Sequence, residues 1–309
     1  MLLAASASGL SAQTEVPPKP EHVPTPPERP KAGKAKATKA AAPASTEKKA
    51  WLTLPPTPTL PPAKESATVK VNGVDIYYAI YGDGPPVVLL HGGLGSSDYW
   101  GHQVPALVAA NYKVIVMDTR GHGRSPMTSR KFGYNIFAQD LEALLAEIEQ
   151  QFVSIVGWSD GAITGLQLAL TKPNLVSKLF AFGANSTLSG LIPKGSKTPV
   201  FASYAARAKA EYARLSPDPK KWPQLVSDLG VMWRTQPNFT PQQLKTIKPT
   251  TAISDGEHDE IIKPEHTREM ARQIPGSQLL ILPEVSHFAM LQNPAQFNQA
   301  LLKFLLPET

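Results

Sequence analysis

The sequence IVGWSDGAIT, residues 155–164, runs from a stretch of apolar residues into a serine that stands between two glycines. The apolar stretch predicts a buried strand, and the following AITGLQLAL, residues 162–170, predicts a helix. Between them, residues 157–161, GWSDG, match the motif G-x-S-x-G. This motif forms a tight strand-to-helix turn in which side chains at positions 157 and 161 would collide, so both residues are glycine. Such a turn holds the serine hydroxyl exposed, which makes Ser159 a candidate nucleophile.

Outward from this turn, the chain alternates between apolar runs that predict buried strands and amphipathic segments that predict helices. Residues 135–150, NIFAQDLEALLAEIEQ, place leucine and isoleucine at helical spacing with acids on the opposite side. A hairpin is predicted around Asn72 and Gly73. Strands that alternate with helices form a mostly parallel sheet covered on both faces, so we expect an α/β fold. The predicted buried strands lie at 86–93, 113–118, 152–159, 178–185, 250–256 and 277–283.

Two segments depart from this alternation. Residues 1–64 hold 13 of the 31 prolines and few large apolar side chains, so we expect a disordered tether there, followed by a folded domain at 65–309. Residues 186–248 contain no buried-strand run, and we expect them to form a small helical cap over the active edge of the sheet. Most aromatic residues of this insertion are expected in its own core and some in the roof of a pocket, among them Phe201, Tyr204, Tyr212, Trp222, Trp233 and Phe239.

The positive net charge belongs to the predicted tether. Residues 1–64 carry 9 Lys and Arg against 4 Asp and Glu, which leaves 22 against 21 for the rest of the chain. The tether is therefore expected to contact acidic surfaces, whereas nothing predicts a nucleic-acid-binding face on the domain. No apolar run approaches the roughly 18 residues of a membrane-spanning helix, so we expect no membrane span.

The extreme N-terminus, MLLAASASGLSA, is apolar and rich in small residues. Two short stretches, which end at Ala7 and at Ala12, resemble the residues that precede signal cleavage sites, but no basic segment lies in front of them. We expect the remnant of a secretory signal peptide and hence a periplasmic or secreted protein, with a cytoplasmic protein as the alternative. The chain has no cysteine, which is compatible with either compartment.

A serine nucleophile needs a base, and the base needs an acid that holds it in one tautomer. After a G-x-S-x-G turn, the acid should come first and a histidine second. His287 follows the last predicted strand, and ISDGEHDEII, residues 253–262, supplies two acids after the strand before it. Asp255 directly precedes a glycine, the usual place of a turn-forming aspartate. Asp259 lies farther out in the loop, and we predict that it is the acid that reaches His287.

An oxyanion that develops during catalysis needs two hydrogen-bond donors. One is predicted to be the backbone N–H of Asp160, the residue after the nucleophile. The other is expected in HGGLG, residues 91–95, with Gly93 as the first choice and Leu94 as the second. His91 is expected to shape this turn rather than to perform chemistry.

Five motifs together resemble the α/β-hydrolase fold superfamily over roughly residues 67–309: HGGLGSS, DTRGHGRS, GWSDG, GEHDEII and VSHF. GWSDG with FGAN downstream is further similar to the biphenyl-hydrolase-like group, which includes valacyclovir hydrolase. The resemblance implies an eight-stranded sheet, a triad of Ser159, Asp259 and His287, no cofactor or metal, and a cap formed by the insertion. Haloalkane dehalogenases and epoxide hydrolases of this fold carry aspartate at the nucleophile position, so the serine excludes them.

We therefore expect a serine hydrolase that cleaves a small to medium carboxylic ester or related small-molecule acyl substrate through an acyl-enzyme intermediate. A lactonase or a cofactor-free perhydrolase or haloperoxidase on the same triad is the alternative enzyme. An alternative of another class is a non-catalytic binding protein that the tether attaches to an envelope surface.

The aspartate next to the nucleophile raises an electrostatic question. A carboxylate about 6 Å from the oxyanion would oppose it by roughly 3 kcal/mol at an effective dielectric of 20. In one arrangement the Asp160 side chain turns toward the first turn of the following helix, where the helix dipole favours it. In the other it faces the pocket and binds a cationic substrate group, such as the amino group of an amino-acid ester, as the resemblance to valacyclovir hydrolase suggests. The sequence leaves both arrangements open.

Overall fold

A computed structural model describes residues 49–306 of the chain. The expected signal-peptide remnant and the first 48 residues of the expected tether, with its contacts to acidic surfaces, lie outside the described residues.

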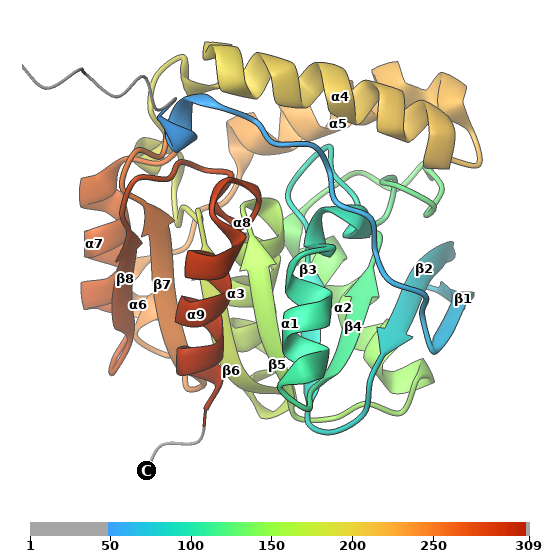
Figure 1. Ribbon diagram of the computed structural model, residues 1–309, viewed down its shortest axis with the longest axis horizontal. Coiled ribbons are helices and arrows are strands. Elements are labelled where there is room, and N and C mark those ends of the chain that lie inside the picture. Colours follow the sequence, from blue (N-terminus) through green and yellow to red (C-terminus); the bar gives the residue numbers. More distant parts are fainter. Residues whose placement is uncertain (1–48, 307–309) are drawn as a thin grey trace, which may run out of the picture. The chain divides into compact units, whose positions relative to one another are not determined.

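Eight strands form one sheet in the order β1-β2-β4-β3-β5-β6-β7-β8 (Figure 1). The pairs β1·β2 and β2·β4 are antiparallel and all other neighbours are parallel, which confirms the predicted α/β fold with a mostly parallel eight-stranded sheet. Asn72 and Gly73 adopt positive φ between β1 and β2, as a two-residue hairpin turn requires. The strands are β1 Glu65–Val71, β2 Val74–Tyr81, β3 Pro86–Leu90, β4 Lys113–Met117, β5 Val153–Trp158, β6 Val176–Phe182, β7 Thr250–Gly256 and β8 Gln278–Leu282.

Helices cover both faces of the sheet. Figure 1 shows α1 and α9 in front of the sheet and α2 and α3 behind it. The α-helices are α1 Gln103–Ala109, α2 Tyr134–Glu147, α3 Asp160–Thr171, α4 Pro199–Leu215, α5 Trp222–Thr235, α6 Pro241–Leu244, α7 Pro264–Gln273, α8 Ala289–Gln292 and α9 Pro294–Leu305. Single 3₁₀ turns are η1 Ala50–Leu52, η2 Ser97–Trp100, η3 Pro173–Leu175, η4 Leu188–Gly190, η5 Gly195–Lys197 and η6 Pro219–Lys221.

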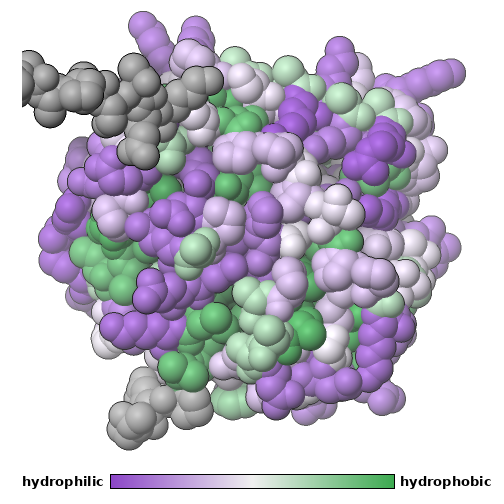
Figure 2. All heavy atoms as spheres, viewed as in Figure 1, coloured by the Kyte–Doolittle hydropathy of each residue, from purple (hydrophilic) through white to green (hydrophobic). Residues whose placement is uncertain are grey.

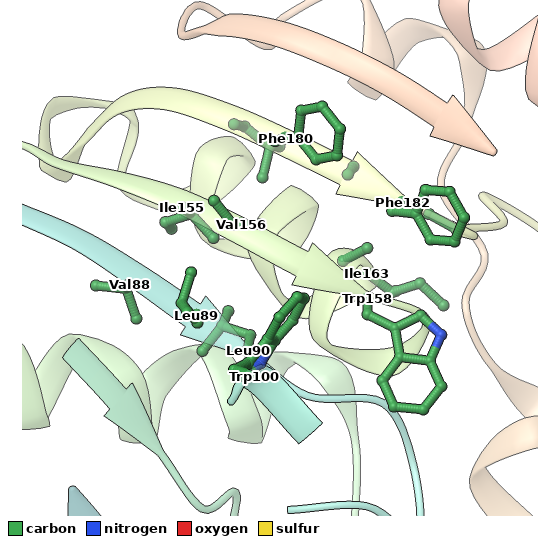
Figure 3. Packing of buried hydrophobic residues seen from close by; sticks show 14 of the residues in the cluster. Val88, Leu89, Leu90, Trp100, Ile155, Val156, Trp158, Ile163, Phe180 and Phe182 are labelled. Carbon is green, nitrogen blue, oxygen red and sulfur yellow. The ribbon is translucent and has the colours of Figure 1, made fainter. Parts of the chain in front are cut away.

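The central strands β3, β5 and β6 form the middle of the core. Val88, Ile155 and Phe180 lie on these three neighbouring strands and are completely buried (Figure 3). Both faces of these strands are covered, which explains why their sequences read as continuous apolar runs. The carboxyl ends of this rigid platform position the loops described below.

The insertion expected at 186–248 lies across the carboxyl ends of the strands. Its long helices α4 and α5 run side by side over the sheet (Figure 1). At the base of the insertion, Thr187 and Asn238 form an isolated bridge, so its two ends meet. Helix α4 begins at Pro199, and the side chain of Thr198 accepts a hydrogen bond from the Phe201 N–H at 3.3 Å, a favourable N-cap.

The structure differs from the predicted boundary at residue 64, because residues 49–64 lie against the domain. We call these residues the N-terminal strap. Leu54 and Leu60 pack against the hydrophobic core, and the Thr53 carbonyl accepts a hydrogen bond from the Gln292 side chain at 2.9 Å. The Trp51 ring stacks on His258 with 4.0 Å between ring centroids. The domain therefore includes the strap, which is extended by its prolines and held by a few apolar side chains.

The surface in the view of Figure 2 mixes hydrophilic and hydrophobic residues without a broad apolar band. Within residues 49–306, none of the helices has both the length and the apolar character that crossing a membrane requires.

Candidate active site

Ser159 lies at the tip of the predicted turn between β5 and α3. Its backbone has a φ of 55° and a ψ of −121°, a strained conformation for a residue with a side chain. A Cβ on Gly157 would lie 2.4 Å from the Ala162 Cα, and one on Gly161 would lie 2.2 Å from the Leu90 carbonyl oxygen. Both glycines are therefore required by the close approach of the turn to its neighbours, as the sequence predicts.

His287 and Asp259 come together from the loops after β8 and β7. The Nδ1 atom of His287 lies 2.6 Å from Oδ2 of Asp259, and both side chains are buried. The other carboxylate oxygen of Asp259 accepts hydrogen bonds from the N–H groups of Ile261 and Ile262 at 2.6 and 2.8 Å. These two bonds fix the carboxylate, so it presents one oxygen to the imidazole and leaves Nε2 as the free nitrogen of the ring.

Asp255 makes different contacts. Its carboxyl oxygens accept from the Gly256 N–H at 2.9 Å and from the Thr267 hydroxyl at 2.6 Å. Burial and the neighbouring charge of Asp259 raise the pKa of Asp255 well above its ordinary value. The structure thus assigns Asp255 to the base of the loop and Asp259 to His287, the arrangement predicted from the sequence.

The contact between His287 and Asp259 shifts their pKa values in opposite directions. Burial works to lower the pKa of His287, but the charge of Asp259 and the hydrogen bond to it outweigh burial and raise the pKa above its ordinary value. Burial likewise works to raise the pKa of Asp259, and the charge and hydrogen bond of His287 reverse that effect and lower it. A carboxylate held ionised beside a histidine stabilises the imidazolium form.

Ser159 and His287 line the same cavity, which has a volume of about 470 Å³. Within residues 49–306, no direct hydrogen bond joins the two side chains, and such bonds are often long before a substrate binds. Apolar side chains from the cap and from the loops after β6 and β7 form much of the wall. They include Leu188, Leu191, Ile192, Phe201, Trp233, Ile261 and Ile262.

The turn after β3 lies directly against the nucleophile. A Cβ on Gly92 would lie 3.2 Å from the Ser159 Cβ, and Gly93 lines the cavity. The Gly92 carbonyl accepts from the Gly95 N–H at 3.1 Å and lies 2.8 Å from the Nδ1 of His91. His91 therefore shapes this turn, as expected. Of the two residues predicted to supply oxyanion donors, Asp160 directly follows Ser159, and Gly93 lines the same cavity and lies against the Asp160 side chain.

The carboxylate of Asp160 faces the cavity rather than the solvent side of its helix. The Tyr134 hydroxyl donates to Oδ1 at 2.7 Å, and the Trp233 indole N–H lies 2.8 Å from Oδ2. Burial raises the pKa of Asp160, against the opposing effects of these two hydrogen bonds and of the charge of His287. Among the described residues no cation forms an ion pair with this carboxylate. Of the two arrangements that the sequence left open, the structure shows the one in which the Asp160 side chain faces the pocket.

The sequence analysis gave no role to two partners of this site. Tyr134 begins α2, outside the five motifs, and only the fold brings it to Asp160. Glu260 follows the predicted acid, and one of its oxygens accepts from the His287 N–H at 3.3 Å. Trp233 and Tyr204 belong to the aromatic residues for which the sequence allowed a place in the pocket roof, and both line the cavity.

In the described part of the chain, one surface group combines side chains that bind metals. The ligand atoms of Glu257, His258 and Glu284 lie within 4.8 Å of one another. Their side chains are exposed or half-buried, they do not line the cavity, and the ring of Trp51 stacks on His258. This group is separate from the candidate active site.

Comparisons with known proteins agree with this geometry. Residues 87–300 match the family described as "Alpha/beta hydrolase family". The chain is 29% identical over 263 residues to the mouse protein "Serine hydrolase BPHL", covering 81% of this chain and 89% of that protein. The structure of Est816, described as an N-acyl homoserine lactone degrading enzyme, is similar with a TM-score of 0.66 and 27% identity over 77% of this chain and all of that chain. A bromoperoxidase from Bacillus anthracis is similar with a TM-score of 0.64 and 27% identity, covering 78% of this chain and 99% of that chain.

Proposed function

We propose that this chain, which belongs to the alpha/beta hydrolase family and is a hydrolase, cleaves carboxylic esters through an acyl-enzyme intermediate on Ser159. The observation that carries the proposal is the common cavity of Ser159 and His287, with His287 held by a buried carboxylate at 2.6 Å. Nucleophilic catalysis by serine uses a histidine base near the hydroxyl and an acid that holds this base in one tautomer, which supports the proposal.

In the proposed reaction, Ser159 Oγ attacks the ester carbonyl carbon while His287 Nε2 takes the hydroxyl proton. The oxyanion is held by the backbone N–H groups of Gly93 and Asp160. His287 then gives its proton to the departing alkoxide, which leaves the acyl group on Ser159. A water molecule, deprotonated by His287, attacks the acyl carbon, and the released serine oxygen takes back the proton. Asp259 stabilises the imidazolium that exists between these transfers.

Labelling with a fluorophosphonate probe tests the nucleophile. The wild-type protein should be labelled and should hydrolyse small esters, and Ser159→Ala should lose both, because the substitution removes the hydroxyl at the tip of the turn. Ser154→Ala is the matched control, since Ser154 is on β5, the strand that leads into the turn, and its hydroxyl contacts Ser177 at 3.0 Å instead of the cavity. Labelling that persists in Ser159→Ala would overturn the proposal.

We further propose that the acyl part of the substrate carries a positive charge, as in an amino-acid ester. The support is the buried Asp160 carboxylate, which faces the cavity and receives hydrogen bonds only from the neutral groups of Tyr134 and Trp233 within the described residues. These donors hold a carboxylate in place without neutralising its charge. A substrate ammonium group there would neutralise it and so remove its repulsion of the oxyanion.

Two benzyl esters of nearly equal size test the charge preference. L-alanine benzyl ester carries an ammonium group where benzyl 2-methylpropanoate carries a methyl group. Asp160→Asn should lower kcat/KM for the alanine ester by about 10- to 100-fold, the usual range for a hydrogen bond to a charged group, and change the neutral ester much less. An equal loss on both esters would show that Asp160 does not recognise a cation.

A lactone is the second candidate substrate, and the likeness to Est816 favours it. Opening a lactone uses the same attack, oxyanion and acyl-enzyme, with the leaving alkoxide still attached to the acyl group. Perhydrolase or haloperoxidase chemistry on this site is supported by the likeness to the Bacillus anthracis bromoperoxidase. A panel of amino-acid esters, neutral esters, lactones and hydrogen peroxide with acetate separates these activities by their kcat/KM values.

A further inference from the structure

The turn that carries Gly93 has little stiffness of its own. Gly93 has no Cβ, so its two backbone dihedrals are free to vary more widely than those of other residues. A preorganised oxyanion site needs donor N–H groups that stay in one direction during the reaction. Hydrogen bonds must therefore hold the two peptide groups on either side of Gly93.

The peptide group before Gly93 is held from within the turn, by the bonds of the Gly92 carbonyl to His91 and Gly95. The peptide group after Gly93 is held by the cap. The hydroxyl of Tyr204 on α4 donates to the Gly93 carbonyl at 2.6 Å. Because a peptide group is planar and trans, fixing its carbonyl also fixes the N–H on its other side, here that of Leu94, and limits the rotation of Gly93.

The ring of Tyr204 cannot easily leave this position, because it is almost fully buried among aromatic rings. Its centroid lies 5.6 Å from Trp158, which precedes the nucleophile, and 5.0 Å from Phe288, which follows His287. Tyr99 packs edge-on against it at 5.6 Å. One turn later on α4, Arg207 lies over the Tyr99 ring at 5.6 Å and donates to the Pro55 carbonyl of the strap. The strap and the cap thus fix the hydroxyl that holds the turn.

We propose that Tyr204 is a positioning residue for the oxyanion site, and that the cap acts on the rate of acyl transfer through its hydrogen bond to Gly93. This inference rests on the proposed function of Ser159 for its kinetic consequences. It assigns to α4 a part in stabilising the transition state, in addition to forming a wall of the cavity.

Tyr204→Phe tests the inference, because it removes the hydroxyl and keeps the ring. Tyr212→Phe is the matched control: Tyr212 lies on the same helix, is equally buried, and does not line the cavity. With an ester substrate, Tyr204→Phe should lower kcat by about tenfold and leave KM within about twofold. The reason is that less well positioned donors weaken the hydrogen bonds to the oxyanion, which forms only in the transition state. The affinity of a boronic acid inhibitor, which forms a tetrahedral adduct with serine, should fall by the same factor.

Amide hydrogen exchange gives a readout that does not depend on activity. In Tyr204→Phe, the segment 91–96 should exchange faster than in the wild type, and in Tyr212→Phe it should not. Unchanged exchange of this segment, a rise in KM with unchanged kcat, or an equal loss of kcat in both variants would each overturn the inference. Failure of the proposed function shows separately, as ester hydrolysis that survives Ser159→Ala.

Discussion

His287 experiences two opposing influences, burial that favours its neutral form and Asp259 that favours its charged form. The partner carboxylate prevails, so the pKa of His287 lies above the ordinary 6.5 of histidine. Only the neutral imidazole can accept the proton of Ser159. The rate of the acylation step should therefore depend on pH in a way that reports the contact between these two residues.

We expect kcat/KM for a neutral ester to rise with pH through a midpoint above 6.5, because this profile reports the base of the free enzyme. In Asp259→Asn the midpoint should move to lower pH, since the strongest of the effects that raise the pKa of His287 is then removed, and the plateau should fall by about 10³- to 10⁴-fold. The profile is measured by initial rates between pH 5 and 9.

Glu257→Gln is the control for this experiment, because it removes an exposed acid from the same loop. Its midpoint should match that of the wild type. If the midpoint of Asp259→Asn also stayed where it is in the wild type, the Asp259 carboxylate would not be the group that raises the pKa of His287.

At the scale of single residues, the sequence predicted those contacts that depend on the local geometry of a turn. Asp259 was separable from Asp255 because a residue next to a turn glycine has little reach, and the distances agree. Tyr134 was beyond prediction, because its contact with Asp160 joins residues 26 positions apart through the packing of two helices. The direction of the Asp160 side chain depended on that contact and on Trp233, so it too had to come from the structure.

At the scale of elements, the strap shows how a segment that contains a single 3₁₀ turn and no strand or α-helix can belong to a folded domain. It crosses the cap helix α4, where Arg207 donates to the Pro55 carbonyl and Glu211 accepts from the Thr57 hydroxyl. Its composition predicted a tether because prolines outnumber large apolar residues in it. Leu54 and Leu60 find their partners only on a surface that the rest of the chain builds, which no local pattern reveals.

Two leucines in the strap give a direct test of its contribution. Leu54 packs against the core, whereas Leu52 is 64% exposed. Leu54→Ala should lower the free energy of unfolding by about 1 to 2 kcal/mol, less than a fully buried leucine, and Leu52→Ala should change it by less than about 0.5 kcal/mol. Denaturant titration of both variants measures the difference, and equal values would mean that the strap does not pack on the domain in solution.

At the scale of the whole molecule, the apolar runs predicted the strands of the parallel sheet because buried strands have no polar face. The strand order was not predictable in the same way. Strand β4 lies between β2 and β3, so β2 and β4, and likewise β3 and β5, are neighbours in the sheet without being consecutive in the chain. The cap could be located as an interruption of the strand and helix pattern, but the hydrogen bond of Tyr204 with Gly93 spans 111 positions and follows only from the assembled fold.

The two ends of the described chain lie at opposite ends of the sheet, with the strap beginning near the cap and α9 ending at the far edge (Figure 1). This placement matters when the enzyme is immobilised on a solid support. Attachment at Lys49 itself would bring the cavity side toward the support and hinder large substrates. Attachment at Leu306 would turn the cavity away from the support into the solution, so immobilisation at that end should keep large substrates accessible.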